Sequence, residues 1–186
     1  MASQWSKQIT IPNILTTLRL FAIPWMAYEI YQSKGSSGLA ALLFLAIWFT
    51  DVLDGWIARR YNQISDFGKL YDPLVDKIFQ LTTAIMMTTV GRVPLWIPIS
   101  IASKDLILLI GGAVLFTKHV VVSAEWFGKI TTVLIAFYFA IMFFLPETYL
   151  YMAPYLFLPV LIMMAITLFL YVKQGWQIYQ TTKEKR

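Results

Sequence analysis

Long apolar stretches make up most of this chain, and short polar segments separate them. A helix crosses the hydrocarbon core of a membrane with roughly 20 residues, and these stretches are about that long. Because the apolar residues gather into such runs, the pattern indicates an integral membrane protein. It predicts six membrane-spanning helices, at residues 13–31, 37–59, 69–90, 94–117, 127–145 and 151–173.

The composition agrees with this prediction. Of the 186 residues, 59% are hydrophobic and 13% are charged, whereas a soluble domain usually carries about 25% charged residues. Six crossings with short loops use nearly the whole length. We therefore expect an all-α integral membrane protein, a six-transmembrane-helix bundle that forms a single domain over residues 1–186. The opening MASQWSKQ fits a short helix at the membrane interface, anchored by Trp5, rather than a cleaved signal peptide.

The basic residues of the loops predict which side of the membrane each loop faces. With a cytoplasmic N-terminus, the opposite side keeps only Lys34 and Arg92, and the positive-inside rule then makes both termini cytoplasmic. The net charge of +5 does not indicate nucleic-acid binding, since the basic residues are scattered rather than striped. The cytoplasmic set comprises Lys7, Arg59, Arg60, Lys69, Lys118, Lys129, Lys173, Lys183, Lys185 and Arg186.

Five of the ten carboxylates fall within residues 51–76, at the predicted cytoplasmic ends of the second and third helices. Asp51 and Asp54 are three residues apart and share a helix face; Asp72 and Asp76 are four apart and also share one. A short link makes the two helices antiparallel neighbours. Four carboxylates can therefore converge in one pocket at membrane depth, where ionisable groups are costly and usually functional.

Such a cluster would repel itself unless cations neutralised it. Oxygen-only ligands suit hard divalent ions such as Mg²⁺, Mn²⁺ or Ca²⁺, and a pair of such ions can activate a nucleophile and stabilise a phosphate leaving group. The absence of cysteine and the single histidine exclude thiolate and histidine-rich metal sites. Small residues at Gly55, Ala58 and Gly68 leave a groove beside the acids, and Arg59 offers a planar fork for phosphate. Together these features indicate a nucleotide diphosphate site.

The string Asp51-x2-Asp54-Gly55-x2-Ala58-Arg59-x8-Gly68-x3-Asp72-x3-Asp76 resembles, position for position, the signature of the CDP-alcohol phosphatidyltransferase family. The opening IPNILTTLRLFAIP is similar to the first helix of members that make phosphatidylglycerophosphate or cardiolipin. The resemblance implies transfer of a phosphatidyl group from CDP-diacylglycerol to an alcohol with release of CMP. It also implies dependence on Mg²⁺ or Mn²⁺, with two ions, a homodimer, and a bacterial cytoplasmic membrane with the active site facing the cytoplasm.

The resemblance also implies roles for individual residues. The first three signature aspartates bind the metal ions, and Asp76 both binds metal and acts as general base on the acceptor hydroxyl. Gly55, Ala58 and Gly68 would accommodate cytidine, while Arg59 would contact a phosphate. Asn13 and Thr16 would contact the CDP phosphates near the active-site mouth. Three cations are candidates for binding the acceptor: Arg19, Lys104 and Lys129.

The signature does not identify the acceptor. Members that use glycerol 3-phosphate resemble one another in an arginine-glutamate pair and a further arginine in the fourth helix, and in a Gly-Lys-x-Lys-Thr start to the fifth. This chain has SKDLILLIGGAVLF at 103–116 and GKITT at 128–132, so Thr131 replaces the second lysine. The former stretch is more similar to CMP-forming cardiolipin synthases, and Gly111 and Gly112 would open space for a second lipid. Phosphatidylglycerol is therefore the predicted acceptor, with glycerol 3-phosphate as the alternative.

Other interpretations remain open at this stage. The aspartates could form buried ion pairs with neighbouring cations, and Lys104 and Asp105 could neutralise each other. A small cation transporter would also place acids in helices. A transport pathway should have acids at several depths, however, whereas this cluster occupies one depth. A di-iron carboxylate protein would need Glu-x-x-His pairs, which a chain with one histidine cannot supply.

Overall fold

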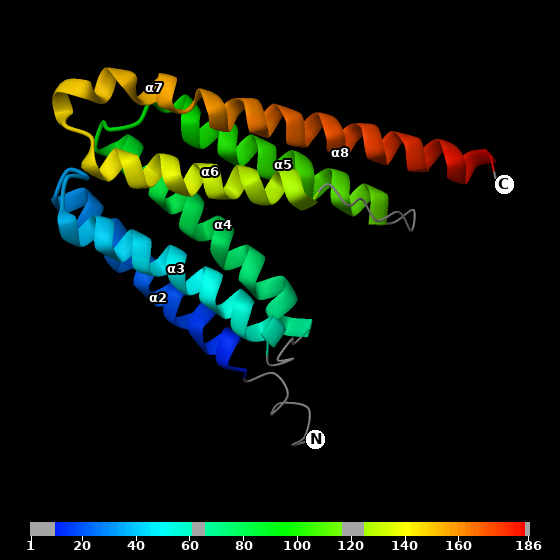
Figure 1. Ribbon diagram of the computed structural model, residues 1–186, viewed down its shortest axis with the longest axis horizontal. Helices are drawn as coiled ribbons and strands as arrows, with labels where there is room; N and C mark the ends of the chain where they lie inside the picture. The colour runs from blue at the N-terminus through cyan, green and yellow to red at the C-terminus, as the bar shows by residue number, and fades with distance from the viewer. Residues whose placement is uncertain (1–9, 61–65, 117–124, 185–186) are drawn as a thin grey trace. The chain divides into compact units, whose positions relative to one another are not determined.

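The computed structural model describes residues 10–60, 66–116 and 125–184, and these ranges contain helices and no strand (Figure 1). The all-helical fold class is therefore confirmed. The elements are α2 (Ile11–Gln32), α3 (Gly38–Arg60), α4 (Asp66–Thr89), α5 (Trp96–Phe116), α6 (Glu125–Phe144), a 3-10 helix η1 (Glu147–Met152), the short α7 (Ala153–Leu156) and α8 (Leu158–Glu184).

The long helices lie where the apolar stretches predict them, with one difference at the end of the chain. The sixth predicted span, 151–173, is divided between η1, α7 and α8, and α8 continues past residue 173 to Glu184. Within the described residues, three segments are long and apolar enough to cross a membrane: Gly38–Ile57, Trp126–Phe144 and Glu147–Gln177. The six-span topology and the cytoplasmic termini stay predictions. The predicted interfacial helix falls on residues 1–9, outside the described residues.

The chain divides into two compact units. The first comprises residues up to Val93 together with Phe139–Leu150, and the second comprises Pro94–Tyr138 and the residues from Tyr151 onward. The end of α6 thus belongs to the first unit and the rest of that helix to the second. The single-domain organisation stays a prediction.

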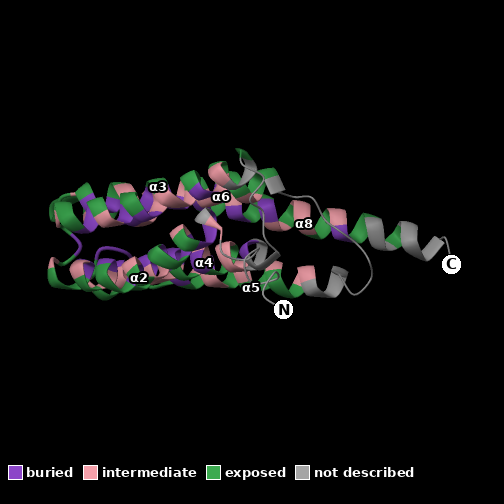
Figure 2. Cartoon of the chain, turned by 90° about the horizontal axis from the view of Figure 1, so that it is seen from below, coloured by how far each residue is buried: buried purple, intermediate pink, exposed green. Residues whose placement is uncertain are grey.

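In the first unit, α2 packs against both α3 and α4. The core is aromatic at its centre, where the Phe44 ring stacks on Phe79 at 5.1 Å between centroids and lies 5.3 Å from Phe143. Buried and exposed positions alternate along these helices (Figure 2), and the exposed ones on α2 include large apolar side chains such as Phe21, which is 74% exposed. An outward face of this kind fits a hydrocarbon environment rather than water.

The turn between α2 and α3 depends on a glycine. Gly35 adopts φ +71°, in the left-handed region, and its N–H donates to the carbonyl of Ile30 at 2.8 Å. The side chain of Arg92 packs over this glycine. Arg92 is buried, and its Nε donates to the carbonyl of Met142 at 3.0 Å while Nη2 donates to the carbonyl of Leu145. Arg92 thereby satisfies carbonyls at the C-terminal end of α6 that have no helical partner.

Gly35→Ala is expected to lower the free energy of unfolding by about 2 kcal/mol, since an L-residue pays roughly that much in the left-handed region. The added Cβ would also clash with Cδ of Arg92. Thermal unfolding of the detergent-solubilised protein measures the effect. Gly38→Ala is the matched control, because a Cβ at Gly38 meets nothing within 4 Å. Equal stability of the two variants would contradict the role assigned to Gly35.

In the second unit, α6 and α8 share a buried polar contact within an apolar core. The hydroxyl oxygens of Thr131 and Thr167 lie 3.0 Å apart, and both residues are buried. The ring of Tyr171, on α8, lies against Gly111 of α5. The approach is so close that a Cβ added at Gly111 would lie 2.9 Å from a carbon of the ring. The expectation that Gly111 and Gly112 open space for a lipid is therefore wrong in this structure, because Tyr171 fills that space.

Candidate active site

Three polar residues of α2 form a buried face near its N-terminus. Thr10 caps the helix, with its hydroxyl oxygen accepting a hydrogen bond from the N–H of Asn13 at 3.4 Å. Pro12 fits the first turn because proline has no N–H, and an N–H at this position would have no acceptor within the helix. The cap sets where the helix begins. Asn13, Thr16 and Arg19 then follow at three-residue spacing, and all three are buried.

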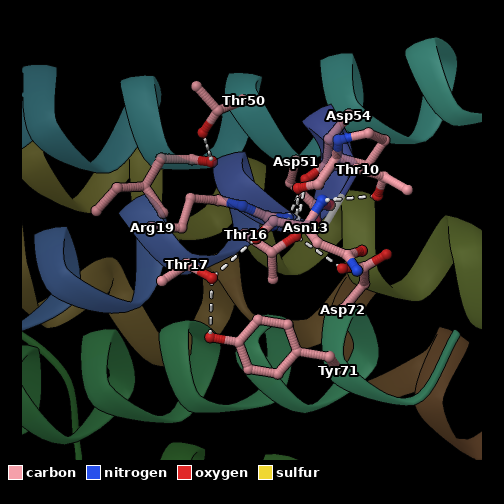
Figure 3. A network of polar contacts seen from close by, with 12 residues as sticks. Thr10, Asn13, Thr16, Thr17, Arg19, Thr50, Asp51, Asp54, Tyr71 and Asp72 are labelled. Atoms are coloured by element: carbon pink, nitrogen blue, oxygen red, sulfur yellow. Dashed lines mark hydrogen bonds and ion pairs between the residues drawn. The ribbon is translucent and has the colours of Figure 1, made fainter. Parts of the chain in front are cut away.

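Arg19 joins the two aspartates of α3. Its Nη1 forms an ion pair with Oδ1 of Asp51, and its Nη2 forms one with Oδ2 of Asp54 (Figure 3). The side chains of Arg19 and Asp54 are each 4% exposed, whereas that of Asp51 is 36% exposed. Helical spacing predicts Asp51 and Asp54 on one face, and in the structure both face one guanidinium.

Thr16 connects Asp54 of α3 to Asp72 of α4. Its hydroxyl lies 2.7 Å from Oδ1 of Asp72 and 3.4 Å from Oδ2 of Asp54, and its oxygen accepts a hydrogen bond from Nη2 of Arg19 at 3.2 Å. The carbonyl of Pro12, at 3.0 Å, is a third acceptor within reach. A threonine hydroxyl carries a single proton, so it donates to one partner at a time, and the shortest of the three distances favours Asp72. Three carboxylates from two helices therefore converge on two side chains of α2.

The remaining signature aspartate, Asp76, lies one turn beyond Asp72 on α4 and is half-buried. Gln80 lies one further turn along the same face and is 5% exposed, and its Oε1 has no hydrogen-bond partner in the described part of the chain. A buried amide oxygen without a donor is uncommon and marks a place where a ligand hydroxyl or amine could donate. Gln80 is not among the residues that the sequence predicts for the site, although its position, four residues after Asp76 in an apolar helix, is a signal of one.

Of the small residues and the arginine in the signature, the structure describes the surroundings of Gly55 and Gly68 only. Gly55 follows Asp54 on α3 and is half-buried, and Gly68 is buried in the first turn of α4. Ala58 and Arg59 belong to the last turn of α3, but their side chains lie outside the described part of the structure. The nucleotide and phosphate contacts of Asn13, Thr16, Gly55, Ala58, Arg59 and Gly68 stay predictions.

The two candidate lysines belong to the second unit. Lys104 is buried on α5, and its Nζ forms an ion pair with Oδ1 of Asp105 at 2.8 Å. The ion pair between neighbouring residues that the sequence suggested is therefore present. Lys129 is exposed at the start of α6, with its Nζ 5.8 Å from the centre of the Trp126 ring. Acceptor binding by Lys104, Lys129 and Arg19 stays a prediction.

The aspartates fit a hard divalent cation in kind, since all the donors are carboxylate oxygens. As they stand, however, no three His, Asp or Glu side chains in the described ranges are grouped so that they could hold one ion. The position between Asp51 and Asp54 is taken by the guanidinium of Arg19. The carboxylates are thus suitable metal ligands, but the guanidinium of Arg19 lies between two of them.

Comparison with known proteins connects this cluster to a family. The family model described as CDP-alcohol phosphatidyltransferase matches residues 9–173. A cardiolipin synthase (CMP-forming) of Streptomyces coelicolor is 35% identical over 111 residues, which is 58% of this chain and 52% of that protein. A CDP-diacylglycerol–glycerol-3-phosphate 3-phosphatidyltransferase of Aquifex aeolicus is 32% identical over 130 residues, 69% of this chain and 72% of that protein.

A third relative is a probable phosphatidylglycerophosphate synthase of Mycobacterium tuberculosis, 31% identical over 127 residues, 66% of this chain and 60% of that protein. The match spans about half the length of the Streptomyces relative and a larger share of the other two. The names of these relatives therefore divide between cardiolipin synthase on one side and phosphatidylglycerophosphate synthase or glycerol-3-phosphate 3-phosphatidyltransferase on the other.

Proposed function

This chain belongs to the CDP-alcohol phosphatidyltransferase family, and on that basis we propose that it transfers a phosphatidyl group from CDP-diacylglycerol to an alcohol acceptor in phospholipid biosynthesis. The observation that carries the proposal is the convergence of Asp51, Asp54 and Asp72, from two helices, on Thr16 and Arg19 of a third. A structural ion pair needs only one carboxylate and one cation. Here three carboxylates carry more negative charge than the single guanidinium of Arg19 can neutralise, and the remaining negative charge suits a cationic ligand.

In the proposed reaction, the hydroxyl oxygen of the acceptor forms a bond to the phosphorus that carries the lipid. The bond from that phosphorus to the oxygen of the CMP moiety breaks, and CMP leaves with the electron pair. Asp76 takes the proton of the hydroxyl, which is the role a carboxylate beside the reacting group can fill at neutral pH. Asp51, Asp54, Asp72 and Asp76 would hold the divalent ions, Mg²⁺ or Mn²⁺, whose charge stabilises the diphosphate and the departing CMP.

Thr16 has a positioning role in this proposal. By donating to Asp72 at 2.7 Å, it fixes one carboxylate oxygen and leaves the other available to a ligand. Gly55, Ala58 and Gly68 would accommodate cytidine, and Asn13 and Arg59 would contact the phosphates. The site would face the cytoplasm from a bacterial membrane, and the enzyme would act as a homodimer.

Phosphatidylglycerol is the acceptor that we favour. A soluble phosphorylated acceptor needs free cations, but Lys104 already has Asp105 at 2.8 Å. Position 131, where other members carry a lysine, holds a threonine that is 0% exposed and whose hydroxyl lies 3.0 Å from that of Thr167. A side chain at this position faces α8, so it offers nothing to a phosphate.

Glycerol 3-phosphate is the second candidate acceptor. It is favoured by the exposed Lys129 and by the Aquifex relative, which is similar over 69% of this chain. Incubating the purified protein with CDP-diacylglycerol, Mg²⁺ and either acceptor, followed by mass spectrometry of the lipids, separates the two. Cardiolipin formed from phosphatidylglycerol supports our assignment. Phosphatidylglycerophosphate formed from glycerol 3-phosphate, without cardiolipin, would refute it and leave the phosphatidyl transfer itself intact.

A further inference from the structure

We propose that Arg19 is a built-in competitor of the metal ion: its guanidinium neutralises Asp51 and Asp54 in the metal-free protein, and a divalent cation must displace it in order to bind. The inference rests on the proposed function, because it takes these aspartates as metal ligands. It assigns to Arg19 a role other than contact with the acceptor.

The competition follows from which oxygens are occupied. Arg19 contacts one oxygen of each carboxylate, Oδ1 of Asp51 and Oδ2 of Asp54, through two different nitrogens. Because these aspartates are three residues apart on α3, the two oxygens face the same point. A single cation can lie at that point, and in this structure it is the guanidinium. A divalent ion and a guanidinium cannot share it, since their charges repel and both need the same lone pairs.

Burial makes the competition strong. The side chains of Arg19 and Asp54 are each 4% exposed, so little water screens their attraction. Hydrogen bonds between charged groups are stronger than neutral ones, and separating a buried ion pair leaves each charge without compensation. The free energy of breaking these contacts is therefore subtracted from the free energy of metal binding. Thr16 adds to it, because its hydroxyl oxygen also accepts from Nη2 of Arg19 at 3.2 Å.

A displaced guanidinium needs a new partner, and an anion is the natural one. Even in the present arrangement, the Nε–H of Arg19 is buried and has no hydrogen-bond acceptor among the described residues. A guanidinium driven off both carboxylates would add further unused donors in a largely apolar bundle, which is costly. The diphosphate of the lipid substrate can accept these donors. Metal and diphosphate should then bind cooperatively, with Arg19 passing from the carboxylates to the phosphates.

The direct test measures Mn²⁺ binding to the full detergent-solubilised chain, without substrate, by electron paramagnetic resonance of the free ion. Arg19→Gln should bind Mn²⁺ about tenfold more tightly than the wild type, the usual scale of coupling between competing ligands. Arg92→Gln is the matched control, because Arg92 is also buried but donates to the carbonyls of Met142 and Leu145. Its Mn²⁺ affinity should equal that of the wild type.

A second variant keeps the test decisive if Arg19→Gln does not fold. Arg19→Lys retains the charge, but an ammonium lacks the fork that spans two carboxylates, so its Mn²⁺ affinity should lie above that of the wild type. Unchanged or weaker Mn²⁺ binding by the folded Arg19 variants would overturn the proposal, since Arg19 would then support the site rather than compete for it.

Thermal unfolding gives an independent readout of the coupling. Mg²⁺ should raise the Tm of Arg19→Gln more than that of the wild type. Adding CDP together with Mg²⁺ should stabilise the wild type by more than the sum of the separate effects, and this excess should shrink in Arg19→Gln. If the rise in Tm beyond the sum of the separate effects were equal in both proteins, the transfer of Arg19 to the phosphates would be contradicted. The metal-binding measurements do not depend on turnover. A failure of the proposed enzymatic activity would therefore be detected separately, as a lack of CMP release in the activity assay.

Discussion

Asp76→Asn is expected to lower the rate of CMP release by about a hundred- to ten-thousandfold, the range typical of losing a general base. Binding of CDP-diacylglycerol should change little, because the other three aspartates would still hold the ions on the diphosphate. Asparagine keeps the size of the side chain but removes its negative charge, so it can no longer take the proton and is also a weaker metal ligand. Turnover with saturating acceptor and equilibrium binding of the labelled liponucleotide measure the two effects separately.

The matched control for this substitution is Asp66→Asn, the same chemical change at the first residue of α4 and outside the signature. It should leave turnover within about twofold of the wild type, as expected for a group that is not part of the reaction. Retained turnover in Asp76→Asn would exclude Asp76 as the base. Loss of both turnover and liponucleotide binding would instead indicate that its main contribution is to hold a metal.

Removal of divalent ions with EDTA is expected to stop CMP release almost completely, and excess Mg²⁺ or Mn²⁺ should restore it. The single charge of Arg19 cannot balance Asp51, Asp54, Asp72 and a diphosphate together, so without divalent ions the substrate would meet a repulsive site. The assay is CMP release before chelation, after it, and after the ion is added back. Unchanged release from metal-depleted protein would contradict the metal-dependent mechanism.

Much of the helical layout could be predicted from the sequence because membrane-length apolar runs carry a strong signal. The end of the chain was less predictable, since the polar composition after Lys173 does not by itself stop a helix, and α8 continues to Glu184. The 3-10 turn at Glu147–Met152 likewise leaves no periodic signature in so short a segment.

The common direction of Asp51 and Asp54 was predictable because helical spacing determines which residues share a face. The same rule could not show that Arg19 lies between Asp51 and Asp54, since these contacts join residues 32 and 35 positions apart on different helices. The contact of Tyr171 with Gly111 was hidden for the same reason. Spacing along one helix gives the direction of a side chain, whereas its partner depends on the tertiary packing.

The most direct test of this account is CMP release by the purified protein supplied with CDP-diacylglycerol and Mg²⁺, with phosphatidylglycerol and glycerol 3-phosphate added separately. We predict release that depends on Mg²⁺ and on an acceptor, and that is faster with phosphatidylglycerol. Faster release with glycerol 3-phosphate would overturn the acceptor assignment alone. No release of CMP with either acceptor, from protein that binds Mn²⁺, would contradict the proposal that this aspartate cluster carries out phosphatidyl transfer to these acceptors.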